Sequence, residues 1–237
     1  IRGGSNSWPI IEQDNDFSGG NLSLDNSALD IKETATFEQT DVLINHGSTA
    51  KIDNLTGYVS KIYVVKDSQL EINKNAIFAG THLIIKDNSN TTIKGALAVE
   101  DLVAIKIDKS NLNVGGVADF TDSALVVQNG SKVMFNDKLT MKNDYEKSII
   151  ILDNGSEINV KGDFENHGVI YYGARAYNAP KITVDGKATL KDTTEIGIYA
   201  TSGLTQAVFL ESKEAIENEA TDENIYAMYF DPDNKDA

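Results

Sequence analysis

Apolar residues alternate with polar ones in short runs along most of the chain, which is the period of a β-strand rather than of a helix. The clearest runs open with a serine and place apolar side chains at the second and fourth positions after it. Runs of this form are residues 27–31, 68–72, 110–114, 131–135 and 156–160, and weaker copies begin at Ser48 and Ser89. We therefore expect a series of strands that each turn one face toward a core.

The serines recur at a nearly fixed interval, so the runs are copies of one structural unit. Successive serines from Ser27 to Ser131 lie 20 or 21 residues apart, and Ser156 follows after 25. A further copy begins at Pro180, another 24 residues along. The longer intervals in the last copies indicate short insertions, which map to loops in repeat proteins.

Each period holds two more strand-like runs. The second run alternates small and large side chains, as in Ala76 and Phe78, and the third is the most apolar, as in residues 125–127. Asn, Asp and Gly fill the turn before each serine, and these residues tolerate left-handed backbone angles. Three strands of about five residues and three short turns account for one period.

This repetition predicts an all-β fold, a right-handed single-stranded parallel β-helix of about eight coils of ~21 residues with three strands per coil. Parallel crossovers are overwhelmingly right-handed, and the period exceeds the ~18 residues of a left-handed hexapeptide helix. A sandwich of antiparallel hairpins is the alternative, because Asn-Gly between apolar runs often marks a hairpin. A meander, however, need not repeat one sequence in phase.

The β-solenoid is predicted to cover residues 21–203. Residues 1–20 include Trp8 to Ile11 and are expected to form an N-terminal cap or lead-in over an open strand edge. Residues 204–237 are acidic, contain a helix-compatible stretch at 211–220, and are expected to be a C-terminal cap or the start of further coils. Because the chain begins at Ile1 rather than Met, we expect a fragment of a larger exported protein or a trimmed piece.

Charge and composition limit the classes of partner and of functional site that this chain can have. A formal net charge of −15 argues against nucleic acid and anionic membrane surfaces and favours neutral or basic partners. The chain has no cysteine, so disulfides, thiol nucleophiles and thiolate metal sites are excluded. His46 and His167 would lie about six coils apart, roughly 29 Å, which is too far to share a metal ion. No catalytic site, metal or cofactor is expected.

One segment interrupts the repeat and is the candidate recognition loop. It contains Tyr171, Tyr172, Arg175, Tyr177 and Asn178, and tyrosine and arginine dominate binding hot spots. An ordinary loop of an enlarged coil is the plainer interpretation of the same residues. A lyase acting on acidic polysaccharide would need cationic side chains, whereas this chain has only two arginines, Arg2 and Arg175.

Residues 154–170 read Asn-Gly-Ser-x-Ile-x-Val followed by Gly-x-Phe-x-Asn-x-Gly-x-Ile. This repeat pattern resembles the passenger repeats of bacterial type V secreted proteins, the autotransporters and filamentous-haemagglutinin-like exoproteins, over about residues 20–200. The resemblance implies export to the bacterial cell surface or secretion, without membrane insertion by this segment, and carries over no functional residue.

The expected function is a non-catalytic adhesin or adhesin stalk that attaches to a protein or glycan of a host or neighbouring cell. The alternatives are a β-helical polysaccharide lyase or hydrolase, and a self-assembling structural solenoid.

Overall fold

The computed structural model describes residues 10–153, 155–174, 179–200, 209–219 and 225–229, and the regular structure in this part of the chain is entirely β-strand. In chain order the strands are β1 (Ile10–Ile11), β2 (Asn15–Asp25), β3 (Ala28–Asn45), β4 (Thr49–Tyr58), β5 (Lys61–Val65), β6 (Gln69–Ile72), β7 (Ala76–Ala79), β8 (His82–Lys86), β9 (Asn90–Ile93), β10 (Leu97–Glu100), β11 (Ala104–Asp108), β12 (Asn111–Val114), β13 (Ala118–Thr121), β14 (Ala124–Gln128), β15 (Lys132–Phe135), β16 (Leu139–Lys142), β17 (Ile149–Asp153), β18 (Glu157–Val160), β19 (Phe164–Asn166), β20 (Val169–Ala174), β21 (Lys181–Val184), β22 (Ala188–Leu190), β23 (Glu195–Ala200), β24 (Leu210–Ser212), β25 (Ile216–Asn218) and β26 (Ile225–Tyr229).

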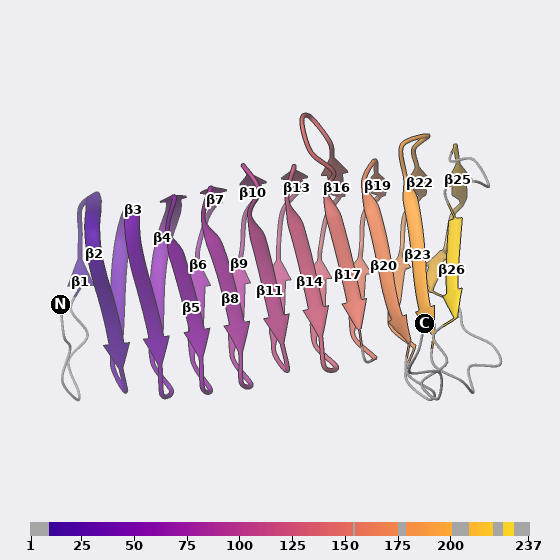
Figure 1. The fold of residues 1–237 in the computed structure, drawn as a ribbon. Helices are drawn as coiled ribbons and strands as arrows, with labels where there is room; N and C mark the ends of the chain where they lie inside the picture. Colours follow the sequence, from indigo (N-terminus) through magenta and orange to yellow (C-terminus); the bar gives the residue numbers. More distant parts are fainter. Residues whose placement is uncertain (1–9, 154, 175–178, 201–208, 220–224, 230–237) are drawn as a thin grey trace.

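The strands stack as a parallel β-solenoid of about 8 turns of ~21 residues, which confirms the predicted fold class. Each strand pairs in parallel with its equivalent one coil later, as β5 does with β8 and β8 with β11. In Figure 1 these front strands run downward, the chain returns upward behind them, and every turn advances toward the C-terminal end. This winding is right-handed. The antiparallel sandwich is wrong because every described pairing is parallel.

The predicted inward positions form continuous columns in the core. Leu70 and Ile72 of β6 are 1% and 0% exposed, and Phe78 and Phe120 of the second strands are both fully buried. Thr91 occupies the inward position of β9 between Leu70 and Leu112, and its hydroxyl has no hydrogen-bond partner. The core is therefore apolar with isolated polar exceptions.

The repeated serines are buried and link one coil to the next. The amide of Ser68 donates to Oγ of Ser89 at 3.1 Å, and the amide of Ser89 donates to Oγ of Ser110 at 3.1 Å. The hydroxyls satisfy backbone amides at a corner where the strand pairing is interrupted, and a buried amide without a partner is costly. This need explains why serine, and not another small residue, opens the copies that precede the one at Pro180.

A second hydroxyl ladder runs along the corner before the third strand in several coils, and the sequence interpretation missed it. The amide of Thr40 donates to Oγ of Ser60 at 3.0 Å, and the amide of Ser60 donates to Oγ1 of Thr81 at 3.1 Å. The ladder resumes where the amide of Ser123 donates to Oγ of Ser148 at 3.2 Å.

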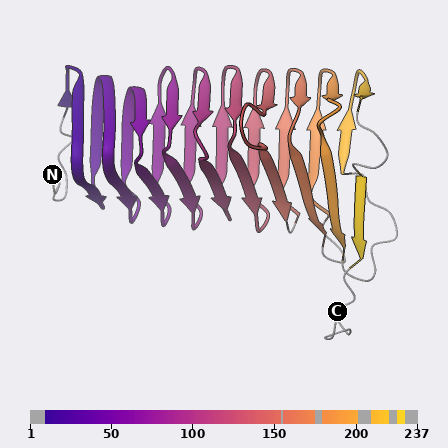
Figure 2. The same ribbon diagram turned by 45° about the horizontal axis from the view of Figure 1, so that its top comes forward.

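Strands lie on both sides of residues 21–203, the range predicted for the solenoid. β2 pairs with β3 from Asn15 onward, so the coils begin before residue 21. The helix-compatible stretch at 211–220 contains strands instead of a helix: β24 and β25 lie there and pair with β21 and β22 as further coils. Figure 2 shows β25 and β26 continuing the stack at its C-terminal end. Trp8 lies outside the described residues, while Ile10 and Ile11 pair with β3.

Within the described ranges, no helix is long and apolar enough to cross a membrane.

Candidate recognition loop

The segment favoured from the sequence is divided between the core and the surface. Tyr172 is 1% exposed and packs on Phe209 with ring centroids 5.0 Å apart, so its side chain is not available to a partner. Burial raises the pKa of its phenol. Tyr171 points outward and covers Gly197, where a Cβ atom would approach the ring to 2.6 Å. Arg175, Tyr177 and Asn178 lie outside the described residues.

A different loop projects from the stack. Residues 143–147 connect β16 to β17, and Figure 1 shows this connection rising above the neighbouring turns. The loop accounts for the longer interval between Ser131 and Ser156. The side chain of Tyr145 is 95% exposed, and Asp144, Glu146 and Lys147 beside it are exposed as well. The loop therefore offers one aromatic ring to solvent among charged neighbours.

Asp122 of the preceding coil holds the backbone of this loop. Its Oδ1 accepts hydrogen bonds from the amides of Asp144 at 2.7 Å and Glu146 at 3.2 Å, and its Oδ2 accepts one from the amide of Tyr145 at 3.1 Å. Desolvation acts to raise the pKa of the Asp122 carboxyl, but these amides outweigh it and hold the pKa below its ordinary value. The loop is thus fixed through its backbone amides, which leaves the side chain of Tyr145 free for contact.

Further contacts close the base of the loop. Oδ1 of Asn143 accepts from the amide of Ser148 at 2.8 Å, and Nδ2 of Asn143 donates to the carbonyl of His167. The Lys147 ammonium forms an ion pair with Glu195 two coils further along. The loop is tied to the coil before it and to the coils after it, so it moves with the stack.

Charged side chains near the loop are paired across coils. Glu165 on β19 lies 2.6 Å from Nζ of Lys138 and 2.9 Å from Nε2 of His167. The hydrogen bond from Lys138, followed by the one from His167, lowers the pKa of Glu165 to about 2. The carboxyl is therefore ionised at neutral pH, which suits a structural ion pair rather than a general acid.

The histidines do not share a corner of the coil, contrary to their similar sequence contexts. His46 follows the third strand of its coil, whereas His167 follows the second strand of its coil. Nδ1 of His46 lies 2.6 Å from Oδ1 of Asp25. Nδ1 of His82 accepts a hydrogen bond from the amide of Ala104 at 3.1 Å, a structural role. Among the described residues no three His, Asp or Glu side chains are grouped to hold a metal ion.

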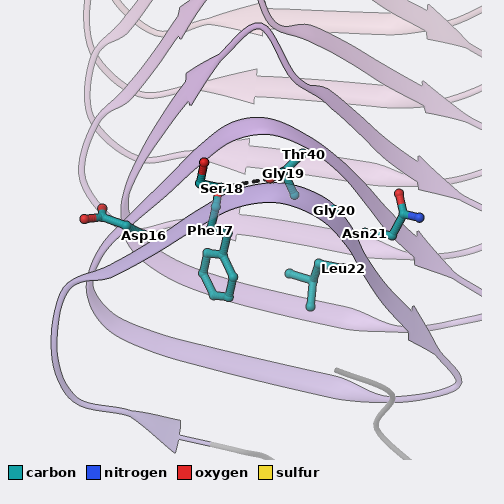
Figure 3. Close-up of a pocket in the computed structure, with 8 residues that line it drawn as sticks. All are labelled: Asp16, Phe17, Ser18, Gly19, Gly20, Asn21, Leu22 and Thr40. Carbon is teal, nitrogen blue, oxygen red and sulfur yellow. Dashed lines mark hydrogen bonds between the residues drawn. The ribbon is translucent and has the colours of Figure 1, made fainter.

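A hollow of about 280 Å³ lies at β2, at the N-terminal end of the stack. Figure 3 shows Phe17 and Leu22 pointing beneath the strand toward the core, while Asp16 points away. Phe17 stacks on Phe37 of the next coil with centroids 5.0 Å apart, and its carbonyl accepts a hydrogen bond from Oγ1 of Thr40 at 2.9 Å. This hollow continues the core column.

The signal for the 143–147 loop was present in the sequence as the 25-residue interval, but the interval does not say which turn is enlarged. Nothing in the sequence identified Asp122 as the anchor, because it lies more than twenty residues before the loop.

No family model matches the chain, and neither the curated proteins nor the solved structures include a match to it.

Proposed function

We propose that the chain is a non-catalytic β-helical passenger, displayed on a bacterial cell surface or secreted, that acts as an adhesin or as the stalk of one. Its partner is a protein or glycan on a host or neighbouring cell. The resemblance of its repeats to type V passengers supports the export route. The observation that carries the proposal is the 143–147 loop, which a buried carboxylate fixes in a projecting position.

The geometry supports attachment because binding loses less entropy when the binding loop is already ordered. Asp122 and Asn143 order the backbone of the loop, while Tyr145 has almost its whole side chain in solvent. A tyrosine ring offers a large contact area with few rotatable bonds. The stack supplies a rigid mount for this ring.

Three carboxylates on the outer surface are poorly suited to act as the general acid of a hydrolase. A catalytic acid must hold a proton near the working pH. Glu165, Glu71 and Asp53 instead have lowered pKa values, because hydrogen bonds from Lys138, Lys94 and Asn73, respectively, stabilise their ionised forms. These carboxylates are built as cross-coil links.

The test incubates the purified chain with intact epithelial and bacterial cells and with immobilised neutral and acidic glycans. Bound protein and newly formed glycan chain ends are measured in the same samples. We expect retention without new chain ends, and Tyr145→Ala should weaken retention at least about tenfold. Val117→Ala, which shortens an exposed apolar side chain at another corner, is the matched control and should bind like the unchanged protein.

New glycan chain ends would contradict the adhesin proposal and indicate an enzyme that cleaves the glycan. Retention on none of these surfaces, together with a particle size that grows with protein concentration, would favour the self-assembling solenoid.

A further inference from the structure

Large apolar side chains are exposed together on the early coils, at the corner between the second and third strands. Tyr58 ends β4 and is 45% exposed, Val59 follows it and is 68% exposed, and Leu102 follows β10 and is 69% exposed. Ile77 on β7, between these two turns, is 42% exposed. We call these four residues the turn ridge. Contiguous exposed apolar groups of this kind mark interaction sites more often than isolated ones do.

Two members of the turn ridge also have unfavourable backbone conformations. Val59 has φ 49° and Leu102 has φ 58°, both in the left-handed region. That region disfavours side chains with a Cβ atom, and β-branched residues most of all. Equivalent turns of neighbouring coils use Gly80 and Asp122, which adopt the same conformation more readily. Gln39 also adopts φ 47° at the equivalent turn of the preceding coil, but glycine or asparagine would fit these positions at lower cost, so the apolar side chains support a role in binding.

Backbone hydrogen bonds hold the turns in a fixed stack. The amide of Val59 donates to the carbonyl of Ala79 at 3.0 Å, and the amide of Leu102 donates to the carbonyl of Asp122 at 3.0 Å. A Cβ atom added at Gly80 would lie 3.4 Å from Cγ2 of Val59, so the valine side chain covers the glycine of the next coil. The turn ridge is therefore a preformed surface, and it lies on the same edge of the stack as the 143–147 loop (Figure 1).

Acidic side chains lie beside the turn ridge, together with one exposed lysine, Lys61 at the start of β5. Glu38, Glu100 and Asp101 are exposed and form no ion pair with any residue that the structure describes. Elsewhere on the stack lysines reach carboxylates across coils, as Lys94 reaches Glu71 at 2.5 Å. Unpaired carboxylates around an apolar centre attract a partner with the opposite charge pattern.

We propose that the turn ridge docks a polypeptide whose apolar side chains are flanked by lysine or arginine. This inference rests on the proposed function and names the partner class for one surface of the adhesin. A glycan fits less well, because Tyr58 alone among the four residues offers its hydroxyl groups a hydrogen bond. A second copy of this chain also fits less well, since it would bring the same carboxylates together.

The test measures binding of a fluorescent peptide of alternating leucine and lysine by anisotropy at physiological ionic strength. We expect the double variant Val59→Asn and Leu102→Asn to weaken binding at least about tenfold. Asparagine tolerates the left-handed region, so this variant should unfold at a temperature no lower than the unchanged protein. Val117→Asn, another uncharged change at an exposed apolar residue, is the control and should leave binding unchanged. Glu100→Gln should weaken binding and reduce its dependence on salt.

Several outcomes would overturn the inference. Failure of the peptide to bind would overturn it. Equal binding of the peptide to the double variant would also overturn it, because it would indicate general attraction to a chain with net charge −15. A glycan whose retention the double variant abolishes would reassign the ridge to sugar binding. Self-association that the double variant abolishes would reassign it to a second copy. If cells retain the unchanged protein and the double variant equally, the inference about the turn ridge fails and the adhesin proposal remains. If the double variant weakens peptide binding but cells retain neither protein, the adhesin proposal fails.

Discussion

Glu165 illustrates what a single side chain contributes on the outer surface of this solenoid. It receives Lys138 from the coil before it and His167 from its own strand region, at 2.6 and 2.9 Å. Its side chain is 28% exposed, so the pairing is partly shielded from water and exceeds the small contribution of a fully exposed ion pair. The lowered pKa of Glu165 makes its contribution depend on pH.

Replacing Glu165 with glutamine should lower the free energy of unfolding by about 1–2 kcal/mol at neutral pH. A carboxyl with a lowered folded-state pKa stabilises the protein above its unfolded value near 4.5 and loses this effect as the pH falls toward about 2. The two proteins should therefore differ in denaturant titrations at neutral pH and converge near pH 2. Glu157→Gln, whose side chain is 48% exposed, is the control and should change stability little. A difference that persisted at pH 2 would contradict the assignment.

The alternation of inward and outward positions along a strand decides which of the two tyrosines meets solvent. Register places Tyr172 in line with Leu152 and Tyr171 in line with Ile151. The equivalent residues of the preceding coils, Ile107, Val127 and Leu152, are all buried, so Tyr172 had to be buried as well. The alternation in the sequence contained this information, and the expectation that both tyrosines join a recognition loop overlooked it.

At the scale of elements, the 143–147 loop depends on an acid in another coil. Asp122→Asn retains a residue that accepts φ 51° and keeps one oxygen acceptor, but replaces the second oxygen with a donor. We expect the amides of Asp144, Tyr145 and Glu146 to lose hydrogen-exchange protection by at least about tenfold, while strands β8 and β11 keep theirs. Asp119→Asn on the neighbouring strand β13 is the control. Unchanged protection in the loop would mean that Asp122 does not hold it.

At the scale of the whole molecule, each coil pairs its strands only with those of the coils beside it. A terminal coil has one neighbour instead of two, so solenoids open from their ends. We expect hydrogen exchange to be slowest in β8, β11 and β14, and faster in β2 and in β24 to β26. Mass spectrometry of the exchanging protein would measure this gradient. Equal protection along the stack would indicate that the solenoid unfolds as one cooperative unit.

The sequence by itself determined the coil, its length and the residues that line its core, because stacked equivalent positions must repeat in phase and alternate in parity. It did not determine which turn carries an enlarged loop or what fixes that loop. Asp122 lies near residues 144–146 only because one coil stacks on the next. The turn ridge likewise joins Val59, Ile77 and Leu102, which are separated in the chain by about one coil each. Such surfaces depend on contacts across the stack, and a pattern read along the chain records only the contacts within one strand.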